Sequence, residues 1–248
     1  MQYQQTDLIV VIPVYNEQDC IEEVIRTWGN FLKGYLGSYH SFRIVMVNDG
    51  SKDSTPAIID RVAADVNYLQ VIHQKNGGHG NAVLNGYREA LKYKPEYVFQ
   101  VDSDNQFLPE DFPKLWDNRT KSNFILGFRK KRYDDFNRLI ITRIMRTLNL
   151  VLFGVHITDA NIPYRLIKGA YLADLLADLP GEPFAPNIFL SVMAKKDGND
   201  LMNIPVTHKE RETGQVSIIK MKLLKVCIRS AKELYAFKAM LRKRKKRG

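Results

Sequence analysis

The stretch DLIVVIPVYN, residues 7–16, reads as a buried β-strand that ends in a polar turn. Its β-branched residues run without interruption up to Pro13, which is typical of strands covered on both faces. After the turn, apolar residues recur at helical spacing from Ile21 to Trp28, and Asn16 is in position to cap this helix. The start of the chain therefore predicts a strand followed by a helix that packs one face on a sheet.

The same unit recurs through the first half of the chain. Further strands are expected in FRIVMVNDGS at 42–51, YLQVIHQ at 68–74 and EYVFQVD at 96–102, with helices between them. The second helix should begin with Thr55 as its cap and Pro56 in its first position. Strands that alternate with helices predict an α/β fold with a mainly parallel sheet covered by helices on both faces.

The second half continues with less regular segments. We expect a strand leading into a basic loop at 123–132, a long helix at 138–154, a loop and a helix at 179–198, and a last strand at 200–211. No internal repeat and no interdomain linker is visible in the sequence. We therefore expect one catalytic domain over residues 1–217 and an appendage over residues 218–248.

Composition limits the classes of protein to consider. The chain has 248 residues, of which 45% are hydrophobic and 26% charged, so a folded globular protein is expected rather than a disordered one. Its net charge of +10 predicts an anionic partner: a nucleotide, a lipid headgroup or a nucleic acid. Cys20 and Cys227 lie far apart without metal-ligand spacing, which fits a reducing, cytoplasmic setting. Neither a signal peptide nor a spanning helix is expected.

Polar side chains gather where the predicted strands end. In parallel sheets, ligands bind outside the carboxyl ends of the strands. Three strands end in polar groups that would converge on one crevice: Tyr15, Asn16 and Glu17; Asn48 and Asp49; Asp102 and Asp104.

The two aspartates in VDSDNQ, residues 101–106, suggest a metal site. In extended or turning backbone, Asp102 and Asp104 point to the same side and can reach one hard cation. An oxygen-only set without Cys or His favours Mg²⁺ or Mn²⁺ over Zn²⁺. Mg²⁺ characteristically joins protein carboxylates to substrate phosphates, so a nucleoside diphosphate group is the natural occupant. Taken alone, the same residues also fit a turn whose short side chains bond their own backbone.

Several motifs occur together, in the order of one known family. The chain resembles a family 2 glycosyltransferase of the GT-A fold, and is especially similar to the polyprenyl-phosphate sugar transferases. The segments that carry the resemblance extend over roughly residues 7 to 217: VVIPVYNEQDCIEEVI, IVMVNDGSKDST, NGGHGNAVLNGYREAL, VDSDNQFLPEDF, LGFRKKR, ITDANIPYRLIKGAY and HKERETGQVS. Several motifs in register are far more specific than any one of them.

The resemblance implies roles for individual residues. It implies that the nucleotide contacts Pro13, Tyr15, Glu17, Asp49, Gly78, His79, Gly80 and Asp102. It implies that Mg²⁺ or Mn²⁺ is bound by Asp102, Asp104 and Gln106. It implies that the acceptor contacts Arg129, Arg138, Thr142, Arg211 and Ser217. The catalytic set would then be Asp102, Asp104, Arg129, Asp159 and Arg165.

The chain also departs from the family pattern. His79 stands where many relatives have Lys or Arg, IPYR at 162–165 replaces the usual GFR, and RETGQVSI at 211–218 has an extra residue between its glycine and serine. Asp159 is the candidate to take a proton from a hydroxyl acceptor or to hold the donor sugar. Its alternative is a helix cap or turn residue.

The expected activity is inverting sugar transfer from a UDP- or GDP-linked donor to a polyprenyl-phosphate or other lipid-linked acceptor at the cytoplasmic face of the membrane. One alternative acceptor is a hydroxyl of a surface glycan. The other alternative is a catalytically silent protein that binds nucleotide sugars. No nucleic-acid partner is expected.

The appendage reads as a basic amphipathic helix that ends in RKRKKR, residues 242–247. Its apolar residues fall on one helical face: Ile219, Leu223, Val226, Leu234, Phe237 and Leu241. Such a helix is typical of peripheral membrane attachment. The alternatives are a helix packed on the domain with a solvated basic tail, and a nucleic-acid contact, which the lack of interleaved aromatic residues disfavours.

Overall fold

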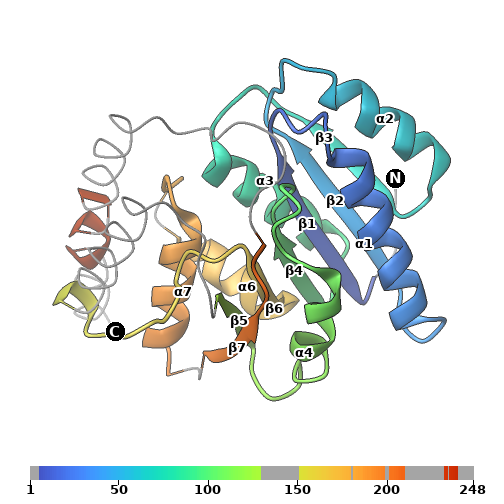
Figure 1. Cartoon of the computed structure of the whole chain (residues 1–248). Coiled ribbons are helices and arrows are strands. Elements are labelled where there is room, and N and C mark those ends of the chain that lie inside the picture. Colours follow the sequence, from blue (N-terminus) through green and yellow to red (C-terminus); the bar gives the residue numbers. More distant parts are fainter. Residues whose placement is uncertain are drawn as a thin grey trace.

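The computed structural model describes residues 6–129, 151–179, 181–198, 201–209, 232–233 and 235–239 (Figure 1). The first half contains β1 (Leu8–Val14), α1 (Ile21–Leu36), β2 (Phe42–Asn48), α2 (Thr55–Asp65), β3 (Leu69–His73), α3 (His79–Lys92) and β4 (Tyr97–Val101). The second half contains the 3₁₀ turn η1 (Pro109–Asp111), α4 (Phe112–Trp116), β5 (Phe124–Arg129), β6 (Tyr164–Lys168), α6 (Gly169–Ala177), α7 (Pro186–Lys196) and β7 (Met202–Val206). Residues 151–153 and the described part of 232–239 are also helical.

The strands form one sheet in the order β3-β2-β1-β4-β6-β5-β7. The pairs β1–β2, β2–β3, β1–β4 and β5–β7 are parallel, whereas β6 runs antiparallel to both β4 and β5. The prediction of a mainly parallel α/β sheet is therefore confirmed. Strand β6 and helix α6 were not predicted. The run YRLIK of β6 does not look like a buried strand, because its Arg165 is charged, although the side chain is completely buried.

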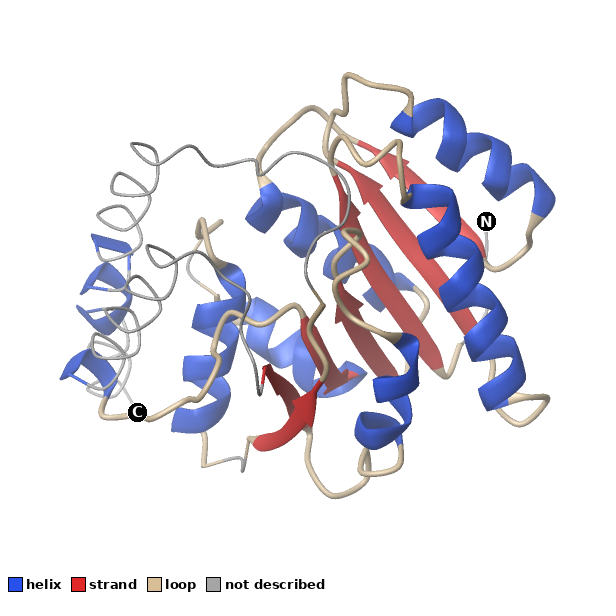
Figure 2. Cartoon of the chain, in the orientation of Figure 1, coloured by secondary structure: helices blue, strands red, loops and turns tan. Residues whose placement is uncertain are grey.

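Helices cover both faces of the sheet (Figure 2). On one face, α3 approaches β1 so closely that a Cβ at Gly86 would lie 2.4 Å from Cγ1 of Val11. On the other face, the Trp28 ring of α1 lies 5.5 Å from the Phe99 ring of β4. All seven residues of β1 are buried, as expected for a strand covered on both sides.

Two of the predicted helix caps were wrong. Helix α1 begins at Ile21, and Asn16 instead lies in a left-handed turn where its side chain accepts a hydrogen bond from the Lys52 N–H, at 2.8 Å. Thr55 is the first residue of α2, and its hydroxyl accepts the N–H of Glu17 at 2.9 Å. Both side chains join the turn after β1 to the turn after β2, so their polar atoms serve the strand ends.

The C-terminal segment packs on the domain where the structure describes it. Phe237 is 1% exposed, and its ring lies 5.6 Å from that of Phe153 and 5.0 Å from that of Phe189 in α7. This residue was expected on the membrane-facing side of an amphipathic helix, and the contact corresponds to the alternative of a packed helix. The other apolar residues expected on that side lie outside the described residues. None of the described helices has the length and apolar character needed to cross a bilayer.

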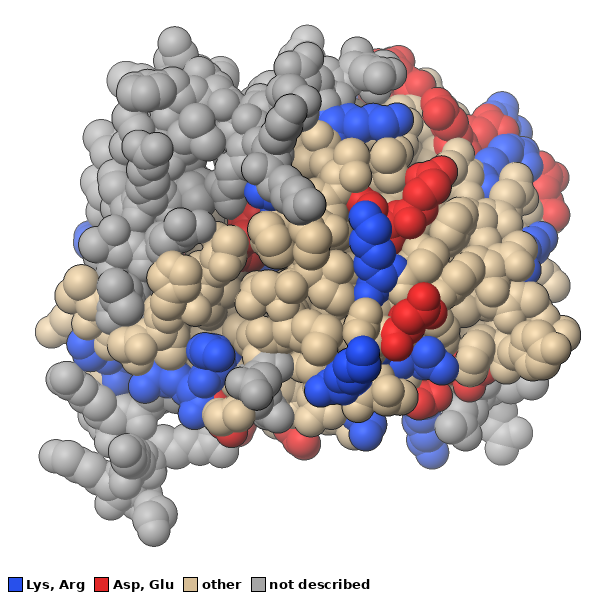
Figure 3. All heavy atoms as spheres, turned by 60° about the horizontal axis from the view of Figure 1, so that its bottom comes forward, with Lys and Arg blue, Asp and Glu red and all other residues tan. Residues whose placement is uncertain are grey.

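Charged side chains of the described residues are unevenly spread over the face drawn in Figure 3. Basic side chains gather along its lower left edge, and basic and acidic side chains lie near one another toward the upper right. In open α/β sheets, ligands bind at the carboxyl ends of the parallel strands, so a site for the anionic partner is sought there.

Candidate active site

The predicted strand-end residues come together where the strand order reverses. From β1, the sheet continues to β2 and β3 on one side and to β4 on the other. Because these strands are parallel, Tyr15, Asp49 and Asp102 each follow a carboxyl end at the same edge of the sheet. Ligands of open α/β sheets bind at such a switch point.

Asp49 organises a glycine loop next to this edge. Its carboxylate accepts the N–H groups of Gly77 at 2.7 Å and Gly78 at 2.9 Å, and the Gln74 side chain at 2.7 Å. Asp49 is 3% exposed, so these bonds satisfy a buried charge. Gly50 follows at a φ of 68°, and a Cβ there would lie 2.7 Å from the Asn76 nitrogen. The structure thus gives Asp49 a role in shaping the loop 74–78. Gln74 was missed, although its position directly after β3 could have indicated it.

The glycine loop leads into the first turn of α3, beside the acidic segment. Gly78, with a φ of 88°, precedes the helix, and His79 and Gly80 are its first residues. His79 Nε2 lies 3.7 Å from Asp102 Oδ1. The amino end of a helix presents backbone N–H groups and partial positive charge, so this end suits an anion.

Asp102 is held in an environment that disfavours its charge. Burial raises the pKa of its carboxyl to about 6; the neighbouring charge of Asp104 acts in the same direction, and the charges of His79, Arg129 and Arg165 act against it. Its Oδ1 is buried and accepts no hydrogen bond from the residues that the structure describes. A buried carboxylate oxygen without a donor fits a site where a cation binds.

The acidic segment forms a turn after β4. Asn105 adopts a left-handed conformation with a φ of 57°, and Asp104 Oδ1 accepts the Gln106 N–H at 3.2 Å. The side-chain NH₂ group of Gln106 donates to the Lys209 carbonyl at 3.0 Å, and the backbone carbonyl of Gln106 accepts the Lys209 N–H at 2.9 Å. The segment is therefore tied to the chain that follows β7.

The residues present fit a divalent cation. Asp102 offers a buried carboxylate oxygen, Oδ1, that accepts no hydrogen bond from the described residues. The described part of the chain contains no cluster of three or more His, Cys, Asp or Glu side chains suited to a metal. Mg²⁺ at nucleotide sites, however, typically uses one or two carboxylates together with phosphate oxygens and waters. Asp102 and Asp104, with the amide of Gln106 beside them, match that smaller set.

Arg129 and Asp159 form a forked ion pair across the second half of the domain. The Arg129 Nε donates to Asp159 Oδ2 at 2.9 Å, and its Nη2 donates to Oδ1 at 3.1 Å. The side chains are 15% and 4% exposed, respectively. Arg129 ends β5, and its charge acts to lower the pKa of the Asp102 carboxyl. Both residues were predicted at the site, but their pairing was not.

Arg165 in β6 is fully buried. Its guanidinium donates to the backbone carbonyls of Ala160 at 3.2 Å, Ile162 at 2.6 Å and Asn187 at 3.0 Å. Burial lowers its pKa, whereas the charges of Tyr87, Asp159 and Asp102 act against that effect. These contacts favour a positioning role for Arg165 over the catalytic role that the resemblance implies.

Three residues that the resemblance implies for the nucleotide lie at the end of β1 or in the turn after it. Pro13 and Glu17 are buried and Tyr15 is partly exposed. Cys20, also buried, donates its thiol to the carbonyl of Ser103 at 3.5 Å, and so joins the start of α1 to the acidic turn. No signal in the sequence indicated this contact.

Four of the predicted acceptor residues lie outside the described residues: Arg138, Thr142, Arg211 and Ser217. The same is true of most of the appendage, residues 218–231, 234 and 240–248. Of the predicted acceptor residues, Arg129 is the one that the structure describes.

Known proteins resemble the chain over most of its length. The family model for glycosyl transferase family 2 matches residues 9–175. An undecaprenyl-phosphate 4-deoxy-4-formamido-L-arabinose transferase of Pseudomonas fluorescens is 28% identical over 87% of this chain and 61% of its own length. A polyprenol monophosphomannose synthase of Mycolicibacterium smegmatis is 26% identical over 83% of this chain and 78% of its own. The chain thus spans about three fifths of the arabinose transferase.

The fold is shared with a solved glycosyltransferase. Glucosyl-3-phosphoglycerate synthase from Mycobacterium tuberculosis, in complex with Mn²⁺, uridine diphosphate and phosphoglyceric acid, superposes with a TM-score of 0.68. The alignment covers 93% of this chain and 78% of that one at 16% identity, so it supports the fold alone. The expected GT-A fold is confirmed. Because the family model covers well over half of the sequence, the chain belongs to glycosyl transferase family 2.

Proposed function

We propose that this protein transfers a sugar, with inversion, from a nucleotide-diphosphate donor to a polyprenyl-phosphate or other lipid-linked acceptor. The observation that carries the proposal is the meeting of the acidic turn, Asp102 to Gln106, with the amino end of α3 at the switch point of the sheet. The two relatives described above act, by their names, on lipid phosphates or lipid-linked sugars. They support this acceptor class for the chain.

The donor's diphosphate would lie between the first turn of α3 and the acidic turn. The loop held by Asp49 sets the backbone of Gly77 and Gly78, and the helix end offers N–H groups toward an anion. His79 contributes a donor beside Asp102, and positive charge when it is protonated. Tyr15, Glu17 and Asp49 flank the place proposed for the nucleoside, and both UDP- and GDP-linked sugars remain candidates.

Asp102, Asp104 and Gln106 would hold Mg²⁺ or Mn²⁺ in this arrangement. When bound, such an ion neutralises charge on the departing diphosphate. The bound Mn²⁺ and uridine diphosphate named for the mycobacterial synthase support the same type of donor site here.

The Arg129–Asp159 pair favours a phosphate acceptor over a hydroxyl acceptor. A hydroxyl must lose a proton to a base within hydrogen-bond reach, whereas a lipid phosphate is already ionised at neutral pH. Asp159 is 4% exposed, and both its oxygens accept hydrogen bonds from Arg129. This arrangement suits a carboxylate that orients an arginine, and arginine suits phosphate oxygens. The protein would work peripherally at the inner face of the membrane, where lipid phosphates are presented.

The test is nucleotide release by the purified full chain. The protein is incubated with Mn²⁺ or Mg²⁺ and a panel of UDP- and GDP-sugars, with polyprenyl phosphate, with glycan acceptors, or with neither. Lipid-dependent release is expected, and it should be lost with EDTA and in the double variant Asp102→Asn/Asp104→Asn. Asp65→Asn changes an exposed carboxylate at the end of α2 and serves as the matched control that keeps activity.

Three results would count against the proposal. Release that depends on a glycan would support the hydroxyl-acceptor alternative. Nucleotide binding without turnover would support a silent binding protein. Full activity in the double aspartate variant would remove the metal site from the mechanism.

A further inference from the structure

The loop that precedes α7 lies directly against the start of α3. A Cβ at Gly80 would lie 2.3 Å from the carbonyl oxygen of Phe184 and 2.8 Å from Cδ of Pro186. Real Cβ atoms do not approach backbone so closely, so only glycine permits this contact at position 80. The position of the loop 181–185 and that of the first turn of α3 are therefore linked.

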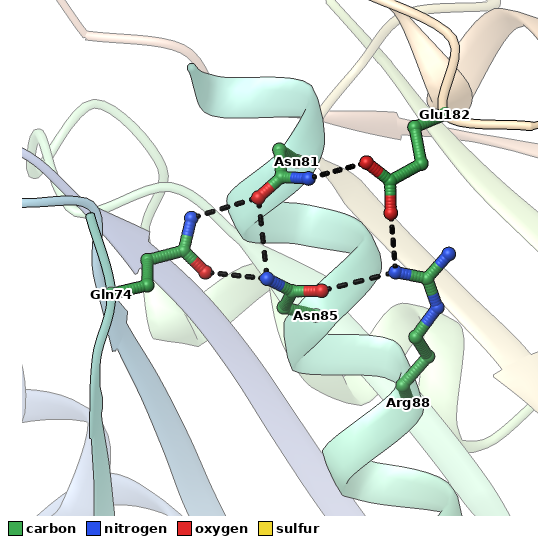
Figure 4. A network of polar contacts seen from close by, with 5 residues as sticks. All are labelled: Gln74, Asn81, Asn85, Arg88 and Glu182. Carbon is green, nitrogen blue, oxygen red and sulfur yellow. Dashed lines mark hydrogen bonds and ion pairs between the residues drawn. The ribbon is translucent and has the colours of Figure 1, made fainter. Parts of the chain in front are cut away.

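A network of side chains holds this loop on α3 (Figure 4). The carboxylate of Glu182 accepts hydrogen bonds from Asn81 and from Arg88, both at 3.0 Å. Arg88 also donates to Asn85 at 3.1 Å, and Asn85 and Asn81 are each bonded to Gln74, at 2.7 Å and 3.0 Å. One connected set of contacts thus runs from the loop, along α3, to the residue after β3.

The same network reaches the glycine loop at the donor side. Gln74 donates to Asp49 Oδ1 at 2.7 Å, and Asp49 accepts the N–H groups of Gly77 and Gly78. The amide nitrogen of Gln74 is therefore shared between Asp49 and Asn81. A shift of the loop 181–185 would therefore act on the first turn of α3 through Gly80 and Asn81. It would also act on the glycine loop through Gln74 and Asp49.

The C-terminal helix holds the other side of this loop. The carboxylate of Glu233 accepts the Phe184 N–H at 2.9 Å. Four residues later, Phe237 is buried against Phe153 and Phe189, which fixes this helix on the core. Glu233 therefore joins an anchored helix to the residue whose carbonyl contacts Gly80. Hydrogen bonds to ionised carboxylates are stronger than those between neutral groups, so this contact can fix the loop.

We infer that Glu233 is a positioning residue for donor binding: it acts through Phe184 to hold the first turn of α3 and the glycine loop in place. The segment 232–239, expected to serve membrane attachment, thus also contributes to the donor side of the site. The inference rests on the proposed function for its effect on the donor. Its effect on the backbone of residues 77–82 does not depend on that function.

Variants of the full chain that keep or remove the hydrogen-bond acceptor at position 233 test this inference. Glu233→Gln keeps an oxygen that can accept the Phe184 N–H, whereas Glu233→Ala removes it. Lys232→Ala alters an exposed neighbour on the same helix and is the matched control. Two quantities are measured well below the unfolding temperature: the dissociation constants of UDP and of GDP with Mn²⁺, and amide hydrogen exchange along the chain.

In Glu233→Ala, we expect nucleotide binding to weaken about three- to tenfold and exchange to accelerate at residues 77–82, while exchange in β1 and β2 is unchanged. The Lys232 control should resemble the unmodified protein. The Gln variant should lie between the unmodified protein and Glu233→Ala, because a neutral amide oxygen is a weaker acceptor than a carboxylate. Glu182→Ala should give the same pattern, and its effect should be less than additive with Glu233→Ala, because both act on one loop.

Two results would overturn the inference. One is unchanged exchange at 77–82 in Glu233→Ala. The other is acceleration spread evenly over the whole domain, which would mean a general loss of stability. If neither UDP nor GDP binds the unmodified protein, the proposed function fails, but the exchange pattern still decides whether Glu233 positions α3.

Discussion

Breaking the Arg129–Asp159 pair should destabilise the protein strongly. The pair is bidentate, and its side chains are only 15% and 4% exposed. Removing one partner takes both hydrogen bonds of the fork away from the other, largely buried charge, and breaking a buried pair in this way costs about 3–5 kcal/mol. For a chain of this size, each kcal/mol shifts the unfolding temperature by about 2–4 °C. Arg129→Met or Asp159→Leu should therefore lower it by roughly 6–20 °C.

The double variant Arg129→Met/Asp159→Leu should recover most of that loss. Replacing both members of a buried pair by apolar groups removes both buried charges together, and such changes are often close to neutral. Thermal and urea unfolding of the two single variants and the double variant give the coupling between the residues. The exposed pair of Arg26 and Glu22 in α1, at 3.0 Å, is the control, and breaking it should cause no measurable change.

The same variants test the chemistry of the pair. If the double variant unfolds like the unmodified protein but does not transfer sugar, the pair serves the acceptor as well as the fold. Two results would refute the reasoning about burial. One is a single variant as stable as the unmodified protein; the other is a double variant that loses as much as the two single variants combined.

Two further predictions follow from close contacts and from charge burial. Gly80→Ala should destabilise the protein by about 1–3 kcal/mol in urea unfolding, because its Cβ would lie 2.3 Å from the Phe184 carbonyl oxygen. Gly34→Ala, where α1 has open space for a Cβ, is the control and should stabilise the protein by up to about 1 kcal/mol. Equal effects of the two substitutions would contradict this reasoning. For Asp102, a folded-state pKa raised from 3.8 to about 6 means that metal-free stability falls as pH rises through this window, by up to about 3 kcal/mol. Asp102→Asn in EDTA should lack this fall and be the more stable protein at pH 7.5, and an Asn variant no more stable than the unmodified protein would rule this out.

The parallel half of the sheet could be predicted because local signals agreed there. Each strand from β1 to β4 is a short apolar run that ends in polar turn residues, and each is followed by a helix or an acidic turn. β6 could not be predicted in the same way. Its second residue, Arg165, is charged and completely buried, and its guanidinium donates to carbonyl groups of Ala160, Ile162 and Asn187. Those carbonyls come from a loop and from α7, so their arrangement is not visible in the run YRLIK itself.

The site was predictable to the same extent. Strand ends identified Asp49 and Asp102, because parallel strands bring their carboxyl ends to one edge. The contacts among the other site residues were harder to predict from the sequence. Arg129 and Asp159 are 30 positions apart and meet because β6 is inserted antiparallel between β4 and β5. The resemblance named both residues, but neither spacing nor composition indicates their pairing.

The C-terminal helix shows what hydrophobic periodicity leaves open. Periodicity indicates that a helix has an apolar face, but it does not indicate what covers that face. Phe237 was assigned to lipid, and the structure places it in the core against Phe153 and Phe189. One ring cannot fill the core and enter a bilayer at the same time. If this helix also inserts into the membrane surface by Phe237, it must leave the domain, and the contact of Glu233 with Phe184 is then lost. Membrane attachment through this face and positioning of the donor loop by Glu233 would then exclude each other, so lipid vesicles that bind the chain through Phe237 should weaken its nucleotide binding.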